Sequence, residues 1–186
     1  MAYFGACKQY IAKVDGDSYT GGAVLPLAGV SVTPVYASGD SYLDNKLGLH
    51  RKEMTKANVT SEVGTIPLAV AAMMYGHTLS KDGKALTYKT TDKAPYCGFG
   101  FIGQEAIDND TDKYTACWIY KVMFEEGEDA FTTHGENITF TNQKFSGVAV
   151  GKKDNTWKDV EQFDTEEEAD TWLRAKANIT ESQAAV

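Results

Sequence analysis

Short runs in which apolar and polar residues alternate dominate the chain up to residue 150, and they are rich in Val, Thr, Tyr, Phe and Ile. Clusters of Gly, Asp, Asn and Ser separate these runs, which is the pattern of strands joined by turns. The strands predicted in this way are 4–14, 27–36, 51–63, 85–90, 96–102, 114–125 and 136–150. We therefore predict a mainly β domain over residues 1–150.

Residues 66–75 (IPLAVAAMMY) are predicted to form a helix that flanks the sheet. The segment is rich in Ala, which favours a helix, and it is apolar on nearly every side. Pro67 suits the first helical position, and Gly76 can adopt the left-handed conformation that ends a helix. Because a helix that is apolar all round must be buried, we expect it to pack against the sheet.

The last part of the chain, residues 151–186, is predicted to be a helical appendage to the β domain. Residues 165–177 place apolar side chains at helical spacing, and Asp164 and Glu167 suit a capping box at the start of that helix. Residues 151–163 are predicted to be a linker. We expect this helix to lie outside the β domain.

Residues 37–50 (ASGDSYLDNKLGLH), which lie between two predicted strands, are predicted to form a long loop. Loops of this length are uncommon in a compact domain and are often functional. Its apolar side chains, Tyr42, Leu43, Leu47 and Leu49, indicate that it packs on something. Two alternatives carry about equal weight: the loop contacts another subunit, or it folds over its own sheet.

The net charge of the chain limits the kinds of partner that it can bind. It has 18 Lys and Arg residues against 26 Asp and Glu residues, which gives a formal net charge of -8. Tight binding to nucleic acid depends on basic residues that displace counterions from phosphates, so this balance argues against it. The N-terminal segment lacks the pattern of a signal peptide, and no apolar run approaches the length of a membrane span, so we expect no membrane partner.

The cysteines and histidines form no recognisable catalytic or metal-binding motif. Cys7, Cys97 and Cys117 share no Cys-x-x-Cys spacing, which suits a reducing compartment, and we predict that they are buried, unreactive thiols. The histidines lack a metal-ligand spacing, so a zinc site is not expected. They are His50, His77 and His134. We predict that the histidine after the first helix only favours the end of that helix, and that the carboxylates in residues 124–131 (FEEGEDAF) are exposed in a turn.

Two further motifs are only superficially like known binding loops. Residues 98–103 (GFGFIG) lie within an aromatic strand pattern, so close sheet packing explains these glycines better than a dinucleotide-binding loop. Asp108, Asp110 and Asp112 are spaced like the first ligands of a calcium loop, but Lys113 stands where that loop needs Gly, and a hairpin turn is the better interpretation. We therefore predict no catalytic residue, no metal and no cofactor, and we expect that the chain is not an enzyme.

An ordered series of motifs resembles one family of phage proteins. Residues 91–103 (TDKAPYCGFGFIG) and residues 114–147 (YTACWIYKVMFEEGEDAFTTHGENITFTNQKFSG) resemble major tail proteins of the phi13-like siphophage family. In that family an APY-G-GF strand precedes a W-YK-F strand and a GE-I-F strand. The segments MAYFGA, GGAVLPLAGVSVTPVYASG and MMYGH fit as well, so the resemblance spans residues 1–150.

The resemblance implies a tail-tube β-sandwich or barrel, in which two packed antiparallel sheets carry one flanking helix. It also implies that copies form hexameric rings, that the rings stack into a non-contractile tail tube, and that DNA is delivered through the tube without specific binding. The implied partners are other copies of the chain, a tape-measure protein, and tail terminator and distal tail proteins. The protein would be assembled in the host cytoplasm and would reside in the virion tail.

Two sets of residues receive roles from this resemblance. In related tail proteins a long loop contacts the neighbouring ring, and the residues at that position here are Asp40, Tyr42, Leu43, Leu47 and Leu49. The lumen of a tube should be polar and neutral or acidic, because positive charges would trap phosphates. Strand alternation gives the lumen candidates Asn58, Thr60, Glu62, Asn137, Thr139 and Thr141.

Two other functions stay open at this point. The inner tube of a contractile tail or of a bacterial injection machine has a related fold, and a partner sheath would distinguish it. A β-sandwich module that binds carbohydrate or a cell surface would share the strands and the acidity. Such a module should be monomeric and should retain a ligand.

Overall fold

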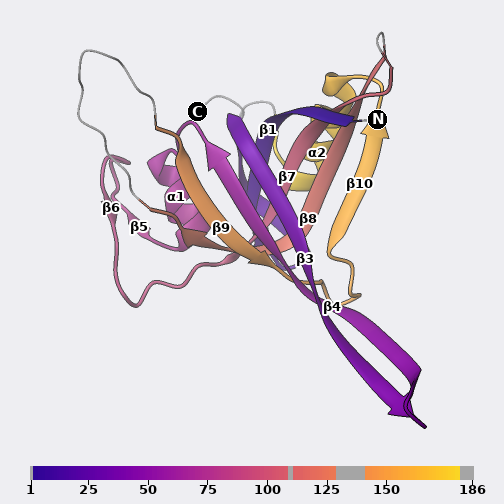
Figure 1. Ribbon diagram of the computed structural model, residues 1–186. Coiled ribbons are helices and arrows are strands. Elements are labelled where there is room, and N and C mark those ends of the chain that lie inside the picture. The colour runs from indigo at the N-terminus through magenta and orange to yellow at the C-terminus, as the bar shows by residue number, and fades with distance from the viewer. Residues whose placement is uncertain (1, 109–110, 129–140, 181–186) are drawn as a thin grey trace, which may run out of the picture.

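The computed structural model describes residues 2–108, 111–128 and 141–180, without the side chains of Ala2 and Leu43 (Figure 1). In chain order these residues form β1 (Ala2–Asp15), β2 (Ser18–Leu25), β3 (Leu27–Leu43), β4 (Lys46–Val63), α1 (Leu68–Tyr75), β5 (Thr78–Leu79), β6 (Leu86–Thr87), β7 (Tyr96–Ala106), β8 (Asp112–Glu126), β9 (Gln143–Ala149), β10 (Lys158–Phe163) and α2 (Glu166–Ala177). The predicted mainly β class, with one flanking helix and one C-terminal helix, is confirmed.

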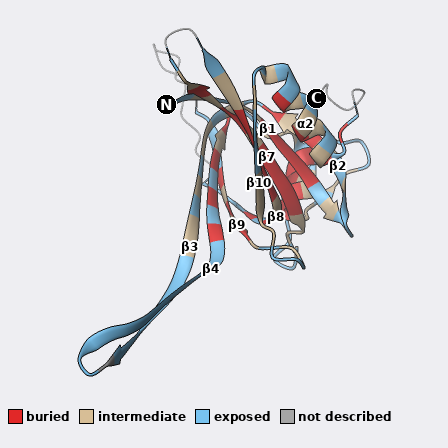
Figure 2. Cartoon of the chain, turned by 90° about the vertical axis from the view of Figure 1, so that its right-hand side faces the viewer, coloured by how far each residue is buried: buried red, intermediate tan, exposed pale blue. Residues whose placement is uncertain are grey.

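One large antiparallel sheet folds into two layers that share β8. Its strand order is β2-β1-β7-β8-β9-β4-β3, and β10 also pairs with β8. Residues 114–119 of β8 pair with β10, whereas residues 122–126 pair with β9. Between these two parts the pairing of β7 with β8 is irregular, as at a β-bulge, which bends a strand. One layer therefore holds β2, β1, β7 and β10, and the other holds β9, β4 and β3 (Figure 2).

The two layers enclose a hydrophobic core, named here the inter-layer core. Ile11 and Phe99 enter it from one layer, Val59 and Phe145 from the other, and Phe124 from the shared strand. The ring of Phe124 meets those of Phe99 and Phe145 edge to face, at centroid distances of 5.7 Å and 5.3 Å. Such edge-to-face pairs add to the free energy gained from burial alone.

Helix α1 packs against the inter-layer core, as its apolar sequence predicts. Val70 and Met74 are buried there. Pro67 immediately precedes the helix, one residue before its predicted position. Gly76 ends the helix with a φ of 77° and donates its N–H to the carbonyl oxygen of Ala72, so the predicted left-handed stop is confirmed.

Helix α2 covers the opposite face of the first layer and forms a second core with it. Tyr10, Trp118 and Leu173 are fully buried in this α2 core. A Cβ atom on Gly98 or Gly100 would lie 2.3 Å or 2.7 Å from the Trp118 ring, so both positions need glycine to admit the indole. This contact explains the GFGFIG motif by close packing, as predicted.

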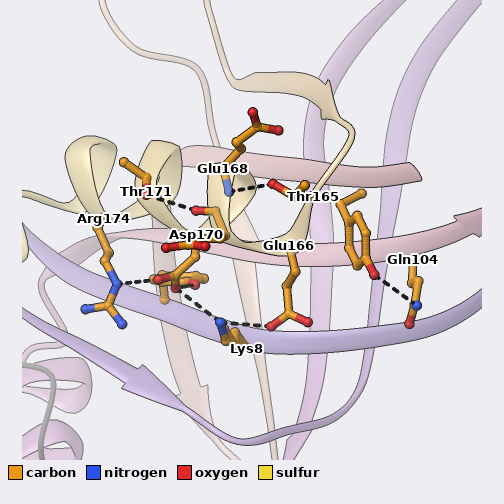
Figure 3. Close-up of polar contacts among 11 residues, drawn as sticks. Lys8, Gln104, Thr165, Glu166, Glu168, Asp170, Thr171 and Arg174 are labelled. Atoms are coloured by element: carbon orange, nitrogen blue, oxygen red, sulfur yellow. Dashed lines mark hydrogen bonds and ion pairs between the residues drawn. The ribbon is translucent and has the colours of Figure 1, made fainter. Parts of the chain in front are cut away.

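Polar contacts fix the start of α2 against β1 (Figure 3). The ammonium group of Lys8 lies 2.8 Å from a carboxylate oxygen of Glu166 and 3.7 Å from one of Asp170. The guanidinium group of Arg174 donates to Asp170 across 2.7 Å. Thr165 is the N-cap and accepts a hydrogen bond from the backbone N–H of Glu168.

The predicted capping box at this helix was therefore wrong by one residue. Asp164 pairs with Lys113 and does not cap the helix. Thr165 takes that role because the chain is extended there and its hydroxyl reaches the third helical N–H.

The structure also corrects the prediction that residues 151–186 form an appendage. Within the predicted linker, β10 pairs with β8 over six registered residue pairs, from Lys158↔Ile119 to Phe163↔Tyr114. Ala169, Leu173 and Ala177 of α2 are fully buried against the sheet. This segment completes one layer and covers its outer face.

The long loop predicted over residues 37–50 is wrong in a more informative way. β3 and β4 continue through it in antiparallel pairing, from Ala37↔Glu53 to Leu43↔Lys46, with one register shift between Ser41 and Tyr42. Asp44 and Asn45 form the tight turn, with φ values of 52° and 60°. Two successive residues with positive φ are typical of the type I′ turn that joins hairpin strands.

Other predicted strands differ at their ends. β2 was not predicted, because its Thr-Gly-Gly sequence interrupts the alternation. The strand predicted over 85–90 is only the two-residue β6, and β9 begins at Gln143, while residues 136–140 lie outside the described part of the chain. The turn predicted at the tip of β7 and β8 is confirmed for the residues described there, since Ile107 donates its N–H to the carbonyl oxygen of Thr111.

Candidate assembly surfaces

The hairpin over residues 37–53 projects from the body as a two-stranded arm (Figures 1 and 2). At about 3.3 Å per residue, its seven residue pairs span roughly 20 Å. Every described side chain from Tyr36 to Glu53 is exposed. An isolated two-stranded hairpin is marginally stable in water, so the arm lacks a stabilising surface within its own described chain.

The far half of the arm carries the apolar residues predicted to contact another subunit. Tyr42, Leu47 and Leu49 are 65%, 56% and 64% exposed. Tyr42 pairs directly with Leu47 across the hairpin, so their side chains share one face. Burying one such side chain completely gains about 1.5–3 kcal/mol, which makes this end of the arm a strong candidate for a covered surface.

Polar contacts join side chains along and across the arm. Asp40 accepts a hydrogen bond from His50 on the opposite strand. Arg51 donates to Glu53 across 2.7 Å, and the ammonium group of Lys52 lies 4.3 Å from the centre of the Tyr36 ring. Exposed contacts of this kind contribute little stability each, so they do not replace a missing third strand.

A polar face lies on the outer side of the second layer. Asn58 and Thr60 are exposed and Glu62 is partly exposed, whereas Val59 and Ser61 between them are buried. The predicted alternation of β4 is therefore confirmed. Registered neighbours extend the face, with Thr33, Ser31 and Ser146 beside the first two of these residues. A groove of about 440 Å³ crosses this face.

An ion pair and a hydrogen bond lie on this face. Glu62 lies 3.4 Å from the ammonium group of Lys144 and accepts a hydrogen bond from Asn142 across 2.9 Å. The hydrogen bond from Asn142, followed by the nearby charge of Lys144, lowers the pKa of Glu62. Thr141, which lies just before β9, is exposed. The other two lumen candidates near it in the sequence, Asn137 and Thr139, lie outside the described residues.

The polar face and α2 lie on opposite sides of the molecule. Figure 2 shows β3, β4 and β9 on one side of the layered body and α2 on the other. The polar face is uncovered among the described residues, whereas α2 buries the outer face of the first layer. A subunit of this form has one open sheet face and one closed face.

The described side chains that come nearest to forming a reactive site surround His77. Its two ring nitrogens lie 2.8 Å from carboxylate oxygens of Asp92 and Glu126, and its ring lies 4.3 Å from that of Tyr88. Burial alone would lower the pKa of His77, but the hydrogen bonds to the two carboxylates outweigh it and raise the pKa. When protonated, the ring can donate to both carboxylates and so links the α1 region to the end of β8.

This cluster was not predicted, because Asp92 and Glu126 lie 15 and 49 residues from His77 in the sequence. Glu126 was predicted to be an ordinary exposed acid, whereas its carboxylate binds His77. Only a histidine beside the helix stop pointed to the site. Among the described residues, no group of histidine, cysteine and acidic side chains suits a metal ion.

The thiols match their prediction closely. All three cysteines are free, and Cys97 and Cys117 are buried in the inter-layer core. Burial raises the pKa of Cys97 to about 12 and that of Cys117 to about 11, which makes both poor nucleophiles. Cys7 is partly buried, and its pKa is raised first by burial and then by the charge of Glu166.

Comparisons with known proteins leave the family open. No protein-family model matches the chain, and no curated protein is similar to it in sequence. None of the described helices has both the length and the apolar character needed to cross a membrane. The resemblance to phage tail proteins therefore rests on its motifs and stays a prediction.

Proposed function

We propose that this chain is the subunit of a non-contractile phage tail tube. Its copies form hexameric rings that stack, and DNA passes through the resulting lumen. The observation that carries the proposal is the arm, an ordered hairpin with exposed apolar residues and no covering surface among the described parts of its own chain. A structural role in the virion accounts for this feature without any catalytic site.

A second copy of the chain is the simplest partner for the arm. Tyr42, Leu47 and Leu49 together expose enough apolar surface to contribute several kcal/mol when covered, at about 1.5–3 kcal/mol each. A contact between an arm and a different surface of an identical copy is heterologous. Heterologous contacts generate closed rings or open filaments, and a stacked tube contains both.

The polar face of β4 supports the placement of the lumen. Its Asn, Thr and Ser side chains can face water and DNA without binding phosphates, and Lys144 on this face is paired with Glu62. The face opposite to it carries α2, which suits the outside of a tube wall. In this arrangement a tape-measure protein would occupy the lumen before DNA, and terminator and distal tail proteins would bind the two tube ends.

Electron microscopy of the purified full-length protein tests the proposal. We expect rings or tubes, and we expect the triple variant Tyr42→Ser, Leu47→Ser, Leu49→Ser to stay monomeric with an unchanged circular dichroism spectrum. Val160→Ser is the matched control, because Val160 is 52% exposed on β10, away from the arm. This control should assemble normally.

A strictly monomeric wild-type protein, both at high concentration and in lysates of infected cells, would contradict the proposal. A partner sheath in the assembled particle would instead favour the inner tube of a contractile tail.

A further inference from the structure

The exposed charges are distributed unevenly between the two ends of the strands. The turn between β7 and β8 and the start of α2 lie at one end, because β10 leads into α2 beside the first residues of β8. Exposed acidic residues gather at this acidic end: Asp108, Asp112, Asp164, Glu167 and Glu168. The basic residues nearest to them, Lys8 and Lys113, are both paired with carboxylates.

The opposite end carries the arm, and its charge is different. Within the β4 strand of the arm and its base, four basic residues accompany one acidic residue, Glu53. They are Lys46, Arg51, Lys52 and Lys56. The facing strand and its turn carry Asp40 and Asp44, and the first of these is held by His50. Beside the base of the arm, Lys121, Lys152 and Lys153 line a groove of about 340 Å³, together with Asp17 and Asp154.

Exposed apolar residues also occur at both ends. Tyr3 and Phe4 at the start of β1 are 66% and 58% exposed. Tyr3 pairs with Glu105 on β7. The neighbouring residue Ala106 pairs with Asp112 on β8, so Tyr3 lies close to that acidic residue. An exposed aromatic patch thus lies within the acidic end, just as Tyr42 and Leu47 lie within the more basic arm.

We infer that the arm of one copy docks on the acidic end of a second copy. Tyr42, Leu47 and Leu49 would cover Tyr3 and Phe4, while the basic side chains of the arm would face the acidic residues around that aromatic patch. This inference rests on the proposed function for the identity of the partner, and it adds the receptor surface. Because the arm and the acidic end are different surfaces at opposite ends of the body, repeated docking along a tube is head to tail and gives a polar assembly.

Charge reversal tests the inference without disturbing either core. Lys46→Glu, Lys52→Glu reverses the arm, and Asp112→Lys, Glu167→Lys reverses the acidic end; all four side chains are exposed or partly exposed on the surface. For each reversed protein we expect the concentration needed for half-maximal assembly to rise at least about tenfold at low salt, because like charges then meet at every junction. Light scattering measures this concentration, and electron microscopy shows whether rings or tubes have formed.

Rescue is the decisive measurement. A chain that carries all four substitutions restores opposite charges at each junction, so it should assemble within about threefold of the wild-type concentration. Lys81→Glu, Lys84→Glu is the matched control, because both residues are exposed in the segment between β5 and β6, away from the two ends. This control should assemble like the wild type.

The outcomes separate the inference from the proposed function. If the wild type forms no rings or tubes, the proposed function fails. If the wild type assembles but the reversed arm assembles equally well, or the fourfold variant is not rescued, the arm docks elsewhere and the inference is overturned. Wild-type assembly, loss in both reversed proteins and rescue in the fourfold variant together support it.

Discussion

The two halves of the β3–β4 hairpin have the same backbone pairing but differ in what stabilises them. In the half that belongs to the body, β4 alternates between the polar face and buried residues such as Val59 and Val63, and β9 pairs along its other edge. In the arm, the same two strands continue with every described side chain exposed and no neighbouring strand among the described residues. Regular hydrogen bonding therefore does not by itself mark the stable part of a sheet.

The difference indicates where the folding free energy resides. The body buries side chains on both faces of β7 and β8, since the inter-layer core lies on one side and the α2 core on the other. The described side chains of the arm are all exposed, and under the proposed function another copy of the chain covers them. Changes in the body should therefore alter stability, and changes in the arm should alter assembly.

The largest expected effect comes from removing β10 and α2. A chain that ends at Trp157 loses Ala169, Leu173 and Ala177 and uncovers Tyr10 and Trp118. At about 1.5–3 kcal/mol for each large side chain, this loss is comparable to the whole stability of a domain, which is about 5–15 kcal/mol. Circular dichroism and thermal melting should show an unfolded chain.

Excising the arm provides the contrast. A chain in which residues 37–53 are replaced by Asn-Gly should keep the circular dichroism spectrum and melting temperature of the body, because every described side chain that is removed is exposed. It should fail to assemble. If the chain that ends at Trp157 stays folded, or if the chain without the arm unfolds, the body is not the part that stabilises the fold.

A smaller effect is expected from adding one methyl group in each region. Gly100→Ala places a Cβ atom 2.7 Å from the Trp118 ring, and overpacking of this kind costs about 1–3 kcal/mol. Gly39→Ala on the arm meets nothing within 4 Å. Urea titration should show a lower free energy of unfolding for the first variant and almost none of that loss for the second. Equal losses would mean that the arm is packed as tightly as the core.

These two regions also differ in how far the sequence predicts them. The buried helix, the inner strands and the alternation of Asn58, Thr60 and Glu62 were predicted because burial on one side imposes a period. The arm is exposed on both faces, so it has no such period, and Asp44 with Asn45 was its only local signal. β10 was missed because all but two of its residues are polar and it lies at an edge. The His77 cluster was missed because tertiary structure alone brings its carboxylates together.

The His77 cluster should give the body a modest dependence on pH. Its folded pKa is raised above 6.5, so its contribution to the free energy of unfolding is fully present below about pH 6.5 and is lost as the pH rises through the folded pKa. Asp92 has a lowered pKa, caused first by the hydrogen bond from His77, so its own contribution changes only at acidic pH, below 3.8. The window above neutrality therefore reports on the histidine.

Comparison with His77→Gln isolates this contribution. The wild-type protein should be more stable than the variant near about pH 5.5, and the difference should shrink toward about pH 9, because the neutral ring can no longer donate to both carboxylates. His50→Gln on the exposed arm is the control and should show no such trend in the stability of the body. A constant difference across this range would show that the ring acts only through packing.

The smallest expected effect on folding, but a direct one on function, concerns the polar face. Thr60→Lys adds a positive charge to an exposed position of β4, so the body should melt as the wild type does. If this face lines the lumen, every ring gains one extra charge per subunit on the path of the DNA. Each phosphate neutralised adds about -0.9 to the slope of log affinity against log salt concentration, so DNA ejection should slow at low salt and recover as salt rises.

Thr171→Lys adds the same charge to an exposed position of α2 on the opposite side of the molecule, and it should leave ejection unchanged. Equal ejection kinetics for both variants in intact tubes would place the lumen on a different face, whereas slowing by Thr171→Lys alone would mean that the subunit is inverted in the tube wall.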